Sequence, residues 1–145
     1  MTSATDSGRP RIIVGVDGSA SSIAALNWAA HQAELTGARL DAVTAWQWPT
    51  KSQFTRTPPD YDPASDAQKG VDAFIDEVTS AYPSVAIQSK VVGGSPARVL
   101  VEESQGADLL VVGSRGHGEF PGMLLGSVSQ HCVTSAHCAV VVLRD

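Results

Sequence analysis

Residues 109–129 read Leu-Leu-Val-Val-Gly-Ser-Arg-Gly-His-Gly-Glu-Phe-Pro-Gly-Met-Leu-Leu-Gly-Ser-Val-Ser. The four apolar residues at the start predict a fully buried strand that stops at Gly113. Further glycines stand at positions 116, 118, 122 and 126, and Ser127 opens a helical pattern. Glycines let backbone N–H groups approach a phosphate, and a helix N-terminus adds unpaired donors and partial positive charge. The stretch therefore predicts an anion-binding loop between a strand and a helix.

The spacing of the glycines separates this loop from other phosphate-binding motifs. A Walker A loop needs a lysine, which residues 113–126 lack, and a dinucleotide fingerprint needs Gly-x-Gly-x-x-Gly after the first strand. The chain has Gly113, two residues, Gly116, nine residues, and then Gly126-Ser127. This pattern resembles the nucleotide-binding loop of ATP-binding members of the universal stress protein family, Gly-x2-Gly-x9-Gly-Ser/Thr. The alternative is an ordinary strand-to-helix turn that is rich in glycine.

Composition is typical of one globular domain. The chain has 145 residues, of which 43% are hydrophobic and 17% charged, and this length suffices for a sizeable core. The net charge of −5 argues against nucleic acid or an anionic membrane as the main partner. Residues 1–10 are expected to form a disordered tail and residues 11–145 a single universal stress protein domain. Because no export signal or long apolar run is visible, we expect a cytoplasmic protein with Cys132 and Cys138 as free thiols.

The rest of the chain alternates strands with helices. Apolar stretches predict further strands at residues 12–17, 40–46, 85–92 and 139–143. Capping residues predict helix starts at Ser19, Asp62 and Ser95, and Ser127 adds the last. Five strands and about four helices in this order predict an α/β fold whose parallel sheet is covered on both faces. The proline-rich stretch 46–68 is expected to be a flap over a ligand.

In such a doubly wound sheet, ligands bind beyond the carboxyl ends of the strands, where the strand order reverses. The resemblance implies the order 3-2-1-4-5 and a Rossmann-like fold of the adenine-nucleotide alpha hydrolase type. The reversal then falls between the first and fourth strands, whose carboxyl ends are Asp17 and Gly113. We therefore expect the carboxylate and the glycine loop to share one crevice.

The resemblance covers Ile12 to Arg144 and assigns three residues to the nucleoside. Asp17 is expected beside the adenine or ribose, whose amine and hydroxyls are donors for a carboxylate. Gly15 matches a position where the strand backbone passes close to the nucleotide, and Ala45 matches an adenine contact. The plainer alternatives are a turn residue at Asp17 and a core residue at Ala45.

The resemblance assigns the phosphates to the glycine loop and the following helix. The residues expected to wrap the phosphates are Gly113, Ser114, Arg115 and Gly116. The residues expected to supply backbone and hydroxyl donors are Gly126, Ser127, Val128 and Ser129. Arg115 is the only cation in this loop, and its alternative is a side chain that faces solvent. One departure is Cys138-Ala139, where family members often carry Cys-Pro.

The expected cofactors are ATP and Mg²⁺, with the ion held mainly through the phosphates and no separate metal site. His131-Cys132 and His137-Cys138 offer zinc-type ligands. Neighbouring residues on a helix, however, point about 100° apart, so we expect no zinc site. No Gly-x-Ser-x-Gly elbow or kinase signature is visible, so no catalytic residue is assigned.

The resemblance implies a nucleotide-dependent regulator or sensor in a stress response, with no rapid turnover and at most a slow ATPase activity. The alternatives are a slow ATPase or adenylate-handling enzyme, and a dimeric interaction module that binds no nucleotide. The resemblance also implies a homodimer formed through the last strand, residues 139–143. The alternative is that a helix covers this strand.

Overall fold

The fold is a three-layer α/β sandwich, seen in a computed structural model that describes residues 8–47, 62–115 and 125–144. The parallel sheet has the order β3-β2-β1-β4-β5. Its strands are β1 (Arg11–Gly15), β2 (Arg39–Trp46), β3 (Ile87–Gly93), β4 (Leu109–Gly113) and β5 (Ala139–Leu143). The helices are α1 (Ala20–Thr36), α2 (Pro63–Ala81), α3 (Pro96–Glu103) and α4 (Ser127–Ser135). The predicted doubly wound five-stranded sheet and its strand order are therefore confirmed.

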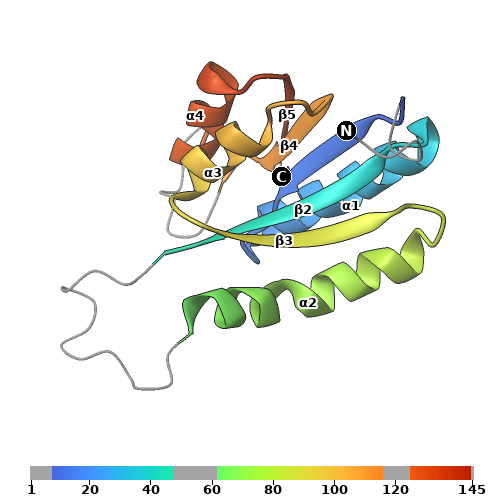
Figure 1. The fold of residues 1–145 in the computed structure, drawn as a ribbon, viewed down its shortest axis with the longest axis horizontal. Coiled ribbons are helices and arrows are strands. Elements are labelled where there is room, and N and C mark those ends of the chain that lie inside the picture. Colours follow the sequence, from blue (N-terminus) through green and yellow to red (C-terminus); the bar gives the residue numbers. More distant parts are fainter. Residues whose placement is uncertain (1–7, 48–61, 116–124, 145) are drawn as a thin grey trace.

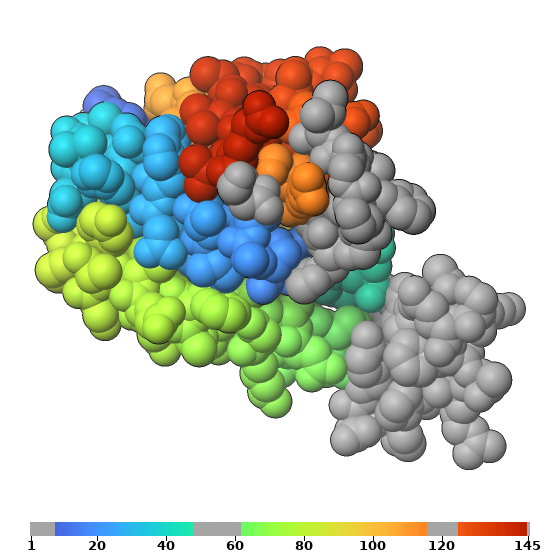
Figure 2. Space-filling view, turned by 180° about the vertical axis from the view of Figure 1, so that it is seen from behind, coloured from blue at the N-terminus to red at the C-terminus, as the bar shows by residue number. Residues whose placement is uncertain are grey.

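Side-chain alternation along the strands creates two apolar layers. Successive residues point to opposite faces, so Ile12 packs with α1 and α2 while Ile13 packs with α3 and α4. Figure 1 shows the two helix pairs on opposite sides of the sheet. Seen from behind, α1 and α2 cover one face, and the last segment of the chain lies beside α1 (Figure 2). Cys132 lies in the second layer, where burial raises the pKa of its thiol to about 11.

Helix ends follow the capping chemistry in the sequence. Ser19 Oγ accepts a hydrogen bond from Ser22 N at 3.2 Å, and Gly37 ends α1 with φ of 75°. Asp62 Oδ1 accepts from Ser65 N at 3.2 Å, and Pro63 occupies the first helical position of α2. The caps at Ser19 and Asp62 agree with the sequence-based expectation, whereas Ser95 is the N-cap of α3 without a side-chain hydrogen bond to that helix.

Several predicted boundaries were wrong. Strand β1 ends at Gly15 instead of Asp17, although Val16 N still donates to Val43 O at 2.9 Å. Strand β3 begins at Ile87 instead of Val85. The predicted flap is helical from Pro63 onward, and residues 48–61 lie outside the described residues. On α4, Val133 is 53% exposed, because it points about 100° away from the buried Cys132.

A group of paired charges lies toward the amino ends of the strands, beneath α3. Arg11 Nε contacts Asp41 Oδ2 at 2.8 Å, and the Arg11 guanidinium also contacts Glu103 Oε1 at 3.3 Å. Lys90 Nζ contacts the same Glu103 oxygen at 2.7 Å. We call these four residues the charge cluster. They come from three strands and the last turn of α3, and they anchor that end of the helix to the sheet.

Within the described ranges, no helix combines the length and the apolar character needed to cross a bilayer.

Candidate functional site

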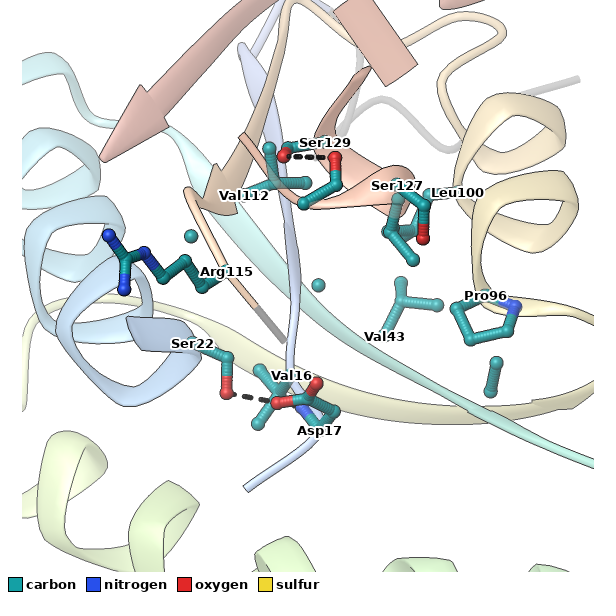
Figure 3. A pocket seen from close by; sticks show the side chains of 15 residues that line it. Val16, Asp17, Ser22, Val43, Pro96, Leu100, Val112, Arg115, Ser127 and Ser129 are labelled. Atoms are coloured by element: carbon teal, nitrogen blue, oxygen red, sulfur yellow. Dashed lines mark hydrogen bonds between the residues drawn. The ribbon is translucent and has the colours of Figure 1, made fainter. Parts of the chain in front are cut away.

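A cavity of about 340 Å³ opens at the carboxyl ends of β1 and β4, with walls from β2, α3 and α4 (Figure 3). It lies where the strand order reverses, which is where doubly wound sheets bind their ligands. Its volume is at the lower end of the range for small-molecule sites. The fold thus places a cavity of ligand size at the position that the topology favours.

Most of the predicted site residues surround this cavity. The lining includes Gly15, Asp17, Ala45, Gly113, Arg115, Gly126, Ser127, Val128 and Ser129. Ser114 is buried and is not part of the lining, and Gly116 lies outside the described residues. The further lining residues, which sequence analysis missed, are Val16, Ser22, Val43, Pro96, Leu100 and Val112.

The end of the cavity formed by β2 and α3 is apolar. Val43 and Ala45 stand two residues apart on β2 and so share one face, and Leu100 comes from α3. The signal that could have found Val43 is its spacing of two residues from Ala45. A Cβ atom on Gly15 would lie 2.8 Å from Leu100 Cδ1, so glycine at this position lets Leu100 pack against β1. We call Val43, Ala45, Pro96 and Leu100 the apolar end.

Gly113 is required by packing as well as by the loop. A Cβ atom there would lie 2.7 Å from the carbonyl carbon of Ser21 and 2.8 Å from its oxygen, which belong to the first turn of α1. Because these are backbone atoms, they cannot rotate away. Gly113 therefore lets α1 approach the end of β4 whether or not a ligand is present.

Several backbone N–H groups at the base of the glycine loop donate hydrogen bonds to other groups of the protein. Ser114 N donates to Leu143 O at 2.9 Å, and Gly126 N donates to Ser114 O at 2.6 Å. Arg115 N donates a longer bond, 3.4 Å, to Ser21 Oγ. These bonds close the loop where it leaves β4 and where it enters α4. The Ser114 amide, expected to face a phosphate, instead connects the loop to β5.

The first turn of α4 faces the cavity with its backbone donors. Gly126 is the N-cap and has no side chain to accept a hydrogen bond from this turn. The first N–H groups of any helix lack partners within the helix and carry its partial positive charge. Ser127, Val128 and Ser129 all line the cavity in this turn. We call these three residues and Arg115, whose guanidinium points away from Ser127 in Figure 3, the anion end.

Asp17 makes the turn contact, and its expected place beside the nucleoside stays a prediction. Its Oδ1 accepts from Ser19 N at 2.9 Å, which is a turn contact, and its own N donates to Ser22 Oγ at 3.2 Å. The side chain is nevertheless exposed and lines the cavity. Arg115 is the one cationic residue among the described lining residues, and in Figure 3 its guanidinium points away from the apolar end.

Comparison with known proteins decides the family. The sequence matches the model of the Universal stress protein family over residues 8–144. The chain belongs to the universal stress protein family. Among curated universal stress proteins, Rv1996 of Mycobacterium tuberculosis is 38% identical over 137 residues. The match covers 92% of this chain and 43% of the relative, so the chain spans less than half the length of that protein.

Solved universal stress proteins share the fold. UspA from Lactobacillus plantarum superposes with a TM-score of 0.77 at 22% identity, covering 94% of this chain and 99% of that one. A universal stress protein solved in complex with cAMP gives a TM-score of 0.71 at 29% identity, covering 95% of this chain and 98% of that one. The predicted family resemblance is thus confirmed by both sequence and fold.

Proposed function

We propose that this universal stress protein binds an adenine nucleotide in the cavity and acts as a nucleotide-dependent regulator or sensor in the cytoplasm. The observation that carries the proposal is that the cavity is lined both by aliphatic side chains of β2 and α3 and by the first turn of α4. A nucleotide has the same division, because its flat base is largely apolar and its phosphates are charged. ATP with Mg²⁺ is the form that the glycine loop predicts.

The apolar end suits a purine ring. Val43, Ala45 and Leu100 offer aliphatic surface from two sides, and such surface gains free energy when it covers a flat ring. Asp17, two residues beyond the end of β1, lines the same cavity and offers acceptor oxygens for ribose hydroxyls or an exocyclic amine. The ring and the sugar would therefore be recognised by different elements.

The anion end suits phosphate. Backbone N–H groups at a helix start bind anions through directed hydrogen bonds and the helix dipole, and Arg115 adds a full positive charge. Asp17 is the one carboxylate among the described lining residues, and these ranges hold no cluster of three metal-type ligands. This donor set fits a Mg²⁺ ion that arrives on the phosphates better than a resident ion.

The relative solved with cAMP supports an adenine nucleotide as the ligand class, since it shares 29% identity over most of this chain. We propose binding without rapid turnover, because the hydroxyls of Ser22 and Ser129 donate to backbone carbonyls and are not paired with a base. The competing hypothesis is a slow ATPase in which Asp17 orients water.

A homodimer through β5 completes the proposal. Strand β5 is last in the sheet order, and Ala139–Leu143 contain no charged residue. The opposite edge, β3, carries Lys90, which is paired with Glu103. Because charged residues discourage edge-to-edge pairing, β5 is the better edge for a second copy. Ala139→Arg should yield a monomer in analytical ultracentrifugation with unchanged melting, and a wild-type protein that is monomeric at every concentration would contradict the dimer.

The test of binding is mass spectrometry of nucleotide released from the purified, denatured protein, beside calorimetric titration with ATP–Mg²⁺, ADP, AMP and cAMP. The variant Ala45→Phe fills the apolar end, whereas Gly70→Ala changes an exposed position of α2 with nothing within 4 Å. Nucleotide should accompany the wild type and Gly70→Ala and be lost from Ala45→Phe. No released nucleotide and no heat with any of the four ligands would refute the proposal. If nucleotide is bound, a measurement of phosphate release from ATP would distinguish a protein that only binds ATP from a slow ATPase.

A further inference from the structure

Ser129 lies in the first turn of α4 and is only 2% exposed. Its Oγ lies 3.0 Å from Gly126 O and 3.3 Å from Ser114 O, and it donates to both carbonyls. A serine hydroxyl has a single proton, so the two carbonyls share it. The hydroxyl is therefore already committed within the protein.

The two carbonyls stand at the two ends of the glycine loop. Ser114 follows β4 directly, and Gly126 is the N-cap of α4. The Ser114 peptide is also held on its other side, because Ser114 N donates to Leu143 O at 2.9 Å. Gly126 N closes the loop by donating to Ser114 O at 2.6 Å. Ser129 thus completes a set of contacts that fixes where the loop begins and ends.

The position of these carbonyls matters for an anion. A carbonyl oxygen carries partial negative charge, and one that turned toward the first turn of α4 would oppose the positive end of the helix. Gly126 O already accepts from Gln130 N at 3.0 Å and Ser114 O from Gly126 N, so the Ser129 hydroxyl is a second donor to each oxygen and offsets part of its charge. An anion at the first turn of α4 then meets less negative charge from these two oxygens.

We propose that Ser129 is a positioning residue of the nucleotide site: its hydroxyl holds the carbonyls of Ser114 and Gly126 and does not itself bind phosphate. The inference rests on the proposed nucleotide binding and assigns Ser129 a role other than that of the phosphate donor that its family resemblance implies. Its effect is specific to ligands with a phosphate, since the apolar end is built from β2 and α3.

Two variants of equal shape isolate the hydroxyl. Ser129→Thr keeps the hydroxyl, and Ser129→Val replaces it with a methyl group. Thr134→Val is the matched control on the same helix, because Thr134 Oγ1 donates to Gln130 O at 2.9 Å on an exposed face away from the cavity. Ser129→Ala adds a smaller variant that forces no extra atoms into the buried site.

Calorimetry with ATP–Mg²⁺ and with adenosine, which lacks phosphate, provides the first measurement. We expect Ser129→Val and Ser129→Ala to bind ATP about three- to tenfold more weakly, the effect of one buried hydrogen bond. Ser129→Thr and Thr134→Val should bind ATP like the wild type, and adenosine affinity should be unchanged throughout. Equal ATP affinity of the Thr and Val variants would overturn the inference, as would a loss beyond about 100-fold, which indicates direct phosphate contact.

Amide hydrogen exchange of Gly126 provides a second measurement that needs no ligand. Its N–H donates to Ser114 O, so exchange should be about three- to tenfold faster in Ser129→Val than in Ser129→Thr. Unchanged exchange would refute the positioning role even if the wild type bound no nucleotide. Absence of all binding with faster exchange would instead refute the proposed function alone and leave the loop contact established.

Discussion

The face of the sheet beneath α3 carries charged and polar groups in different arrangements at its two ends. At the amino ends of the strands, the charge cluster pairs its members with one another, and Asp41 is only 4% exposed there. At the carboxyl ends, the same face opens into a cavity whose anion end combines helix donors with Arg115. Helix α3 spans both, with Pro96 and Leu100 at the cavity and Glu103 in the cluster.

The comparison indicates that polar groups paired within the fold serve stability, whereas polar groups that line the cavity serve ligand binding. Charges that are paired within the fold keep α3 in place but leave little capacity for a ligand. Backbone donors at a helix start that line a cavity can bind an anion, which is the role proposed for the first turn of α4. Substitutions at the two ends should therefore have separable effects, on unfolding at one end and on binding at the other.

The largest expected effect comes from Gly113→Val, which would break the rule that substitutions at the cavity affect binding and leave unfolding unchanged. It lies at the cavity, yet its side chain would meet the backbone of Ser21. We expect a loss of about 4 kcal/mol in the free energy of unfolding, above ordinary overpacking because backbone cannot rotate aside. Thermal and urea unfolding measure it, with Gly70→Ala as the control, which should gain up to about 1 kcal/mol. A well-folded Gly113→Val variant would show that α1 can move.

The next effect is that of Asp41→Ala at the charge cluster. Removing this buried carboxylate leaves Arg11 with Glu103 as its remaining partner, at a cost of about 3 kcal/mol in unfolding free energy. Nucleotide affinity should stay within about twofold, because no cluster residue lines the cavity. Urea unfolding and calorimetry on the same sample test both parts. A tenfold loss of affinity would mean that the two ends are coupled through α3.

A smaller effect, on binding, is expected for Gly15→Ala. The added methyl would displace the Leu100 side chain from a distance of 2.8 Å and narrow the apolar end. We expect about a tenfold loss of both ATP and adenosine affinity, equivalent to about 1.4 kcal/mol. The double variant Gly15→Ala/Leu100→Ala should recover part of that loss, as a double-mutant cycle by calorimetry would reveal. Strict additivity of the two changes would refute the contact.

The smallest effect is expected for Arg115→Gln at the anion end. Arg115 is exposed, so water and salt screen its charge, and ATP affinity should fall about three- to tenfold at low salt. Adenosine affinity and melting temperature should not change. Titrations at low and high salt measure the difference between variant and wild type, which should shrink as salt rises. A salt-independent difference would argue against a charge effect.

Local chemistry explains what could be predicted from the sequence. The caps at Ser19 and Asp62 involve neighbours within three residues, and buried strands such as Leu109–Gly113 are apolar throughout. The cavity position follows from the strand order, which only the family resemblance supplied. Periodicity alone does not determine which strand lies beside which.

Long-range contacts explain what could not be predicted. The charge cluster joins Arg11, Asp41 and Glu103, and no local pattern indicates that these residues meet. The packing role of Gly113 depends on Ser21, and the internal role of Ser114 depends on Leu143. Glycines and serines in the loop therefore predicted a phosphate site without showing which of them hold the loop itself.

The bond from Ser114 N to Leu143 O has a consequence for how the protein is made. The loop residue emerges from the ribosome well before its acceptor, since β5 follows α4 in the chain. Domains are synthesised from the N-terminus, so the sheet can begin to form while the base of the loop still lacks this partner. Any chain that stops before Leu143 lacks the acceptor, and the base of its loop is then without this hydrogen bond to β5.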